Sequence, residues 1–108
     1  METLQEKLER LATSDTYTNI EKYQNIVSEM ADIYRRKNSD YGNSFDKLCN
    51  EFGLMAPIIR LSDKLERIKT LYKSPAKVKD EKIEDTLLDL ANYAVMTLVW
   101  LKNYENSR

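Results

Sequence analysis

The stretch 83–101, IEDTLLDLANYAVMTLVWL, decides the fold because it is the most apolar segment of the chain. Its apolar residues point in nearly every direction around a helix, which is typical of a helix built for burial. Asp85, Asp89 and Asn92 interrupt it at spacing i, i+4 and i+7, so they share one helical face. A buried carboxylate is unfavourable unless a cation or a hydrogen-bond donor compensates it. The spacing alone leaves two interpretations open, a cation site and the wet face of an amphipathic helix.

The composition predicts an all-α fold. A chain of 108 residues suits one domain, which we place over residues 1–108. Two Gly and two Pro, with abundant Leu, Ile, Lys and Glu, favour helices. We expect a small bundle of four to five helices with a long apolar C-terminal helix. Because its neighbours in so small a bundle would not cover such a helix, we also expect a homodimer or homotetramer.

Hydrophobic periodicity and turn residues place the individual helices. The expected helices run over residues 2–12, 18–37, 45–52, 55 or 57 to 72, and 79–82 to 104. The sequence TNIE at 18–21 matches a capping box, so TSDTYT at 13–18 is interpreted as a connection. Near the next break, Gly42 can adopt a positive φ and Ser44 can cap the helix that follows. Trp100, near the end of the apolar helix, is expected to pack rather than to bind a ligand.

The charge and the histidine content exclude several classes of function. The chain has 17 Lys and Arg against 18 Asp and Glu, and its net charge of -1 gives no reason to expect nucleic-acid binding. It contains no His, which excludes Ser-His-Asp and Cys-His catalysis and the usual zinc, haem and non-haem iron sites. A metal site would need oxygen ligands, which favour Mg²⁺ and also suit Mn²⁺.

The sequence predicts a soluble protein with no membrane partner. Its N-terminal sequence METLQEKLERLA is charged throughout and lacks the apolar run of a signal peptide. Residues 83–101 are about long enough to cross a bilayer, but their acidic residues make this unfavourable. The single Cys49 forms no internal disulfide, which fits a reducing cytoplasm.

Charged residues on the helix expected near 55–72 could form a site together with the apolar helix. Asp63 and Glu66 are spaced i, i+3, so their carboxylates lie about one turn apart. The basic residues beside them are Arg60, Lys64 and Arg67. Taken alone, this pattern favours a solvated face with an Asp63–Arg67 ion pair. Facing Asp85 and Asp89, however, it would give four carboxylates around one cavity, a site for Mg²⁺ and a polyphosphate whose remaining charge the basic residues neutralise.

The segment 37–42 is a second candidate for substrate binding. Lys37 could reach a phosphate, Tyr41 could stack on a base, and Asp40 could hold the loop or join the site. The alternative is an ordinary helix terminus, with Lys37 near the negative end of the helix dipole and Asp40 in an Asx-turn. Both interpretations stay open.

Three sequence blocks resemble known families. The blocks, which lie within residues 32–101, are KNSDYGNSF, IRLSDKLERIKTL and EDTLLDLANYAVM. In this order they resemble the nucleotide modification associated domain 1 family, a mostly phage and bacterial group without a firmly assigned activity. More widely, an acidic pair on one helix followed by spaced acids on an apolar helix resembles the MazG-like all-α nucleotide pyrophosphohydrolases, which include dimeric dUTPases.

The wider resemblance implies a Mg²⁺-dependent enzyme that converts an NTP or dNTP to the monophosphate and pyrophosphate. A modified deoxynucleotide is one candidate substrate, and a bacterial or phage-infected cytoplasm is the implied location. Glu66 would be the general base and Asn92 would hydrogen-bond the sugar or base. The implied metal ligands are Asp63, Glu66, Asp85 and Asp89, and the implied phosphate ligands are Arg60, Lys64 and Arg67.

The chain departs from the MazG-like pattern at both acidic motifs. Ser62 precedes Asp63 where a leading acidic pair is typical, and Thr86 stands where a glutamate would precede Asp89 by three residues. Two alternatives stay open, and these departures support the first. One is a non-catalytic protein that binds or sequesters a nucleotide. The other is a helical interaction module whose acidic stripe pairs with basic residues across an oligomer interface.

Overall fold

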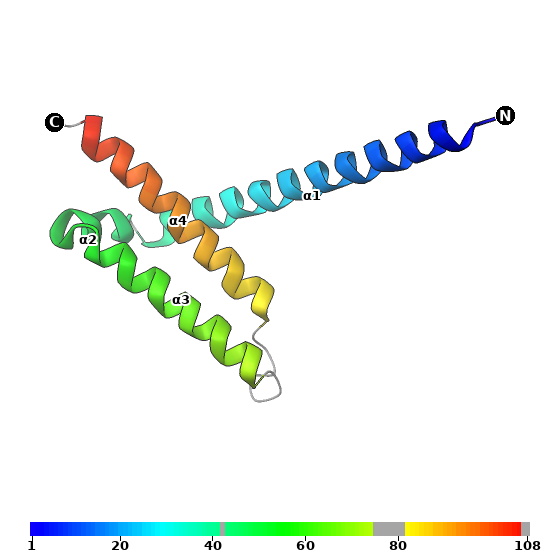
Figure 1. Cartoon of the computed structure of the whole chain (residues 1–108). Coiled ribbons are helices and arrows are strands. Elements are labelled where there is room, and N and C mark those ends of the chain that lie inside the picture. Colours follow the sequence, from blue (N-terminus) through cyan, green and yellow to red (C-terminus); the bar gives the residue numbers. More distant parts are fainter. Residues whose placement is uncertain (42, 75–81, 107–108) are drawn as a thin grey trace. The chain divides into compact units, whose positions relative to one another are not determined.

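The predicted all-α fold is confirmed by the structure, a computed structural model that describes residues 1–41, 43–74 and 82–106 (Figure 1). Of residues 12–17 and 41 it describes the backbone only. The helices of the described residues are α1 (Leu4–Tyr41), α2 (Ser44–Phe52), α3 (Met55–Lys73) and α4 (Ile83–Asn106). Internal contacts divide the chain into two compact units, Met1–Arg36 and Lys37–Arg108. The single domain over 1–108 stays a prediction.

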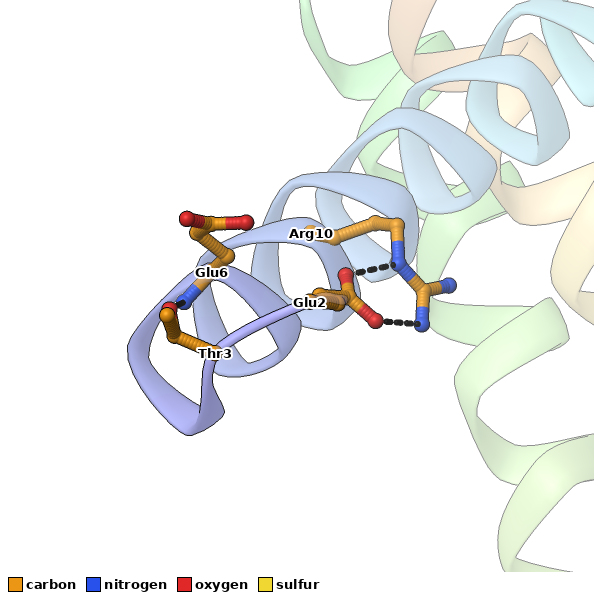
Figure 2. Close-up of polar contacts among 4 residues, drawn as sticks. All are labelled: Glu2, Thr3, Glu6 and Arg10. Carbon is orange, nitrogen blue, oxygen red and sulfur yellow. Dashed lines mark hydrogen bonds and ion pairs between the residues drawn. The ribbon is translucent and has the colours of Figure 1, made fainter.

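Helix α1 begins at a capped N-terminus. The backbone N–H of Glu6 donates to Oγ1 of Thr3 at 3.1 Å, as Figure 2 shows. This satisfies one of the first N–H groups of the helix, which have no partner within it. Arg10 donates to both carboxylate oxygens of Glu2, at 2.8 and 3.3 Å, and so ties the leading residue to the second turn. The sequence TLQE at 3–6 thus supplies the cap.

The predicted connection at 13–18 is wrong, because α1 runs through it without interruption. The segment TSDTYT has modest helix propensity, but neither Gly nor Pro occurs anywhere in α1. Residues of this kind cost only a few tenths of a kcal/mol each in a helix interior, which the flanking turns offset. The capping-box sequence at 18–21 therefore lies inside a helix, and α1 also continues beyond the predicted end at Lys37.

Two residues with positive φ mark the boundaries of α2. Asn43 has φ 64 and ψ 34, so it, rather than Ser44, stands at the N-cap position. Asn tolerates this left-handed conformation better than most residues. Gly53 has φ 68, and its N–H donates to the carbonyl of Cys49 at 2.8 Å, which ends the helix. The expected role of Gly42 lies outside the described residues.

Helices α3 and α4 form an antiparallel pair that holds the core of the second unit (Figure 1). Helix α3 starts at Met55 and accommodates Pro57 in its first turn, where a missing N–H costs nothing. Phe45 and Cys49 of α2 are buried together with Trp100 of α4. Nε1 of Trp100 donates to Oδ1 of Asn50 at 2.9 Å, so the polar edge of the buried ring is satisfied.

The thiol of Cys49 is fully buried, and its environment opposes ionisation. Burial raises the pKa of Cys49 above the ordinary 9.0, and the nearby carboxylate of Asp46 adds to this. Since folding favours the neutral thiol, its stabilising contribution is present below pH 9.0 and is lost as the pH rises through the folded-state pKa.

We expect Cys49 to react slowly with iodoacetamide at pH 8 in the folded protein. The thiolate is the reacting species, and a buried thiol with a raised pKa supplies little of it. Because Cys49 is the single cysteine, mass spectrometry reads its modification without ambiguity. The same reaction in denaturant serves as the control, and equal rates in the two conditions would contradict the burial described above.

Large apolar side chains remain exposed along the second unit. On α3 these include Met55, Ile58, Ile59, Leu65 and Tyr72, and on α4 they include Leu87, Val95, Leu98 and Val99. Despite this, none of the helices within the described residues combines the length and apolarity needed to span a membrane.

Candidate functional site

Asp89 lies between two lysines that come from different helices. Its Oδ1 is 3.6 Å from Nζ of Lys37, near the end of α1, and its Oδ2 is 3.4 Å from Nζ of Lys64, on α3. The Asp89 side chain is 34% exposed. Lys37, Lys64 and Asp89, although they come from three helices, all belong to the second unit. We call Lys37, Lys64 and Asp89 the two-lysine cluster.

Lys64 is the least exposed member of the two-lysine cluster. Its side chain is 13% exposed, whereas that of Lys37 is 61% exposed. Nζ of Lys64 also lies 6.0 Å from the centroid of the Tyr93 ring, at the outer limit of a cation–π contact. Because Tyr93 follows Asp89 by four residues, both side chains project from the same side of α4. The charge of Lys64 is thus held at a defined, partly desolvated position.

The two-lysine cluster carries more positive than negative charge. One carboxylate faces two ammonium groups, and the sum of their charges is one unit positive. Both N···O distances exceed those of ordinary N–H···O hydrogen bonds, and each ammonium has three N–H donors. The cluster therefore has donors and charge to offer a further anion.

The other predicted carboxylates do not join Asp89. Glu66 follows Lys64 by two residues and so lies on nearly the opposite side of α3. Its carboxylate is 69% exposed and accepts a hydrogen bond from Lys69 at 3.1 Å. Asp63 and Asp85 are exposed. Within residues 1–41, 43–74 and 82–106, no group of three or more Cys, Asp or Glu side chains could hold a metal ion.

The carboxylates of one chain consequently do not fit a Mg²⁺ centre as they stand. Both oxygens of Asp89 face lysines, and Glu66 belongs to a separate surface ion pair. Oxygen ligands are the right chemical type for Mg²⁺, but several must converge on one point. The assignment of Asp63, Glu66, Asp85 and Asp89 as metal ligands stays a prediction, as does the role of Glu66 as base.

The remaining predicted substrate residues differ in their exposure. Asn92, one turn beyond Asp89, is half-buried. Asp40 is exposed near the end of α1, and the side chain of Tyr41 lies outside the described residues. Arg60 and Arg67 are exposed on α3. Of the predicted phosphate-binding residues, Lys37 and Lys64 are the pair that meets at Asp89.

The sequence identified Lys37, Lys64 and Asp89 separately but missed that they meet. It also missed the position of Tyr93 beneath Lys64. The available signal was the spacing of Asp89 and Tyr93 at i and i+4, which places an acid and a ring on one helical face. A lysine from another helix can contact both the carboxylate and the ring on such a face.

Comparison with known families identifies the part of the chain that contains this site. The model of the nucleotide modification associated domain 1 family matches residues 37–101, which is more than half of the chain. Comparisons with curated proteins and with solved structures gave no match. The matched range begins at Lys37 and includes all of the two-lysine cluster. The chain therefore belongs to the nucleotide modification associated domain 1 family.

Proposed function

We propose that the chain is a nucleotide-binding protein that holds the phosphates of its ligand at the two-lysine cluster. The observation that carries this proposal is the convergence of two ammonium groups on a single carboxylate. Phosphate oxygens form charge-assisted hydrogen bonds with lysine, and a partly desolvated lysine such as Lys64 strengthens them. Asn92, one turn along α4 from Asp89, would hydrogen-bond the sugar or base.

The activity we propose for this site is pyrophosphohydrolysis of a nucleoside triphosphate, as in the MazG-like enzymes. Support comes from Asp85, Asp89 and Asn92, which share one face of α4, and from Asp89, which pairs with both lysines. Mg²⁺, or Mn²⁺, would supply charge neutralisation of the phosphates. Since the carboxylates of one chain do not assemble a centre for this ion, we derive no catalytic step through it.

A panel of NTPs and dNTPs tests both parts of the proposal, nucleotide binding and pyrophosphohydrolysis. Calorimetry measures binding, and pyrophosphate release in the presence of Mg²⁺ or Mn²⁺ measures hydrolysis. We expect micromolar to millimolar binding of at least one nucleotide. Pyrophosphate release that disappears in Asp89→Ala and persists in Glu105→Ala would support the enzyme. Binding without turnover would leave a sequestering protein, and no binding by any nucleotide would exclude both readings.

Three further expectations belong to the same proposal. A homodimer or homotetramer is supported by the exposed apolar side chains of α3 and α4, which a second copy could cover. A cytoplasmic location, in a bacterium or a phage-infected cell, is supported by the intracellular supply of nucleoside triphosphates. No direct binding of nucleic acid is proposed, because the net charge of -1 means that basic residues do not outnumber acidic ones.

A further inference from the structure

We infer that Asp89 is an internal stand-in for the phosphate at the two-lysine cluster, so that an incoming phosphate must displace its carboxylate from the lysines. This inference rests on the proposed function and adds a control on affinity to it. Its starting point is that each oxygen of Asp89 faces a different ammonium, at 3.6 and 3.4 Å. A phosphate group would bridge the same two donors with two of its own oxygens.

The energetic balance between the two occupants favours exchange. The carboxylate is about one-third exposed, and its distances to both lysines are too long for tight hydrogen bonds. Ion pairs of this kind contribute little, because solvent screens them. A triphosphate brings several negative charges to the same donors, and its charge-assisted hydrogen bonds are stronger than the pairs it replaces. Asp89 nevertheless lowers the affinity for the triphosphate, because its carboxylate occupies the lysine donors and repels the negative charges of the phosphates.

The carboxylate also gives the two-lysine cluster a defined structure. Lys37 and Lys64 carry like charges on different helices, and without a counter-charge they would repel each other. Asp89 holds both ammonium groups near one point before the ligand arrives. We therefore expect Asp89 to order the site before a ligand binds and also to lower the affinity of the site for phosphate.

Removing the charge of Asp89 tests this inference. In Asp89→Asn the shape of the side chain is kept, and we expect inorganic tripolyphosphate to bind roughly fivefold to tenfold more tightly than to the natural chain in metal-free, low-salt buffer. Calorimetry measures the affinity, and circular dichroism confirms the helical fold. Glu84→Gln is the matched control, because it removes one negative charge from an exposed position on the same helix. If Asp89→Asn does not fold, Asp89→Ser carries the same expectation.

Each outcome has a separate meaning. Tighter binding in Asp89→Asn with no change in Glu84→Gln supports the inference. Unchanged or weaker binding in Asp89→Asn, with or without a lower unfolding midpoint, overturns it and shows a structural ion pair. An equal gain in both variants also overturns it, because net charge would then explain the effect. If the natural chain and both variants bind neither tripolyphosphate nor any nucleotide, the proposed function fails as well.

Discussion

The substitution Trp100→Ala is expected to lower the free energy of unfolding by about 3–5 kcal/mol, a large part of the stability of a small protein. Trp100 is 7% exposed and packs with Phe45 and Cys49, so truncation removes the largest side chain of this core and leaves a cavity. It also removes the indole N–H that donates to Oδ1 of Asn50, but Asn50 is exposed and can form a hydrogen bond with water instead. Denaturant titration followed by far-ultraviolet circular dichroism measures the loss.

Two further variants separate the ring of Trp100 from its surroundings. Trp100→Phe keeps an aromatic ring but loses the donor and part of the volume, so we expect a smaller loss than for alanine. Val99→Ala truncates the neighbouring residue, which is 42% exposed, and we expect a change within about 0.5 kcal/mol. Equal losses in Trp100→Ala and Val99→Ala would show that Trp100 does not anchor the core.

The substitution Lys64→Met is expected to weaken nucleotide binding by about tenfold to a hundredfold, equivalent to the roughly 1.5–3 kcal/mol of a hydrogen bond to a charged group. Methionine keeps an unbranched side chain beside Tyr93 but removes the charge, so packing on the ring is largely preserved. Calorimetric titration with the tightest-binding nucleotide measures the change in affinity. The expected loss exceeds that for Lys37, whose side chain is 61% exposed and better screened.

Lys73→Met is the matched control for Lys64→Met. It removes one positive charge from the last turn of α3, at an exposed position away from the two-lysine cluster. We expect its affinity to stay within about twofold of the natural chain, because exposed charges at a distance are screened by salt. A similar loss in both variants would mean that nucleotide binding depends on overall charge rather than on the geometry around Asp89.

Much of the helical arrangement could be predicted from the sequence because its boundaries rest on local chemistry. Gly53 ends α2, and Pro57 sits in the first turn of α3, as their backbone properties require. The connection predicted at 13–18 was wrong for a physical reason. Ser, Thr and Asp favour caps and turns but tolerate a helix interior, so they permit a break without imposing one. Only Gly or Pro would have imposed it, and α1 contains neither.

The candidate site was less predictable, because it depends on which residues meet across helices. Spacing along one helix groups Asp89 with Asp85 and Asn92, but it carries no information about Lys37, which is 52 residues earlier in the chain. The sequence pattern groups Asp63 with Glu66 because they are one turn apart. The structure separates Glu66 from α4 because Lys64, on nearly the opposite side of α3, is the residue that contacts Asp89. Tertiary packing therefore decides which of several equivalent charges form a site.

The burial of Trp100 has a consequence for how unfolding can be observed. It is the single tryptophan of the chain, and it lies in the unit Lys37–Arg108. Its fluorescence therefore reports the melting of that unit, while the 38 residues of α1 contribute mainly to circular dichroism. Coincident transitions by the two signals would mean that α1 and the second unit unfold as one cooperative system. Separate transitions would mean that α1 melts independently, with its own local stability.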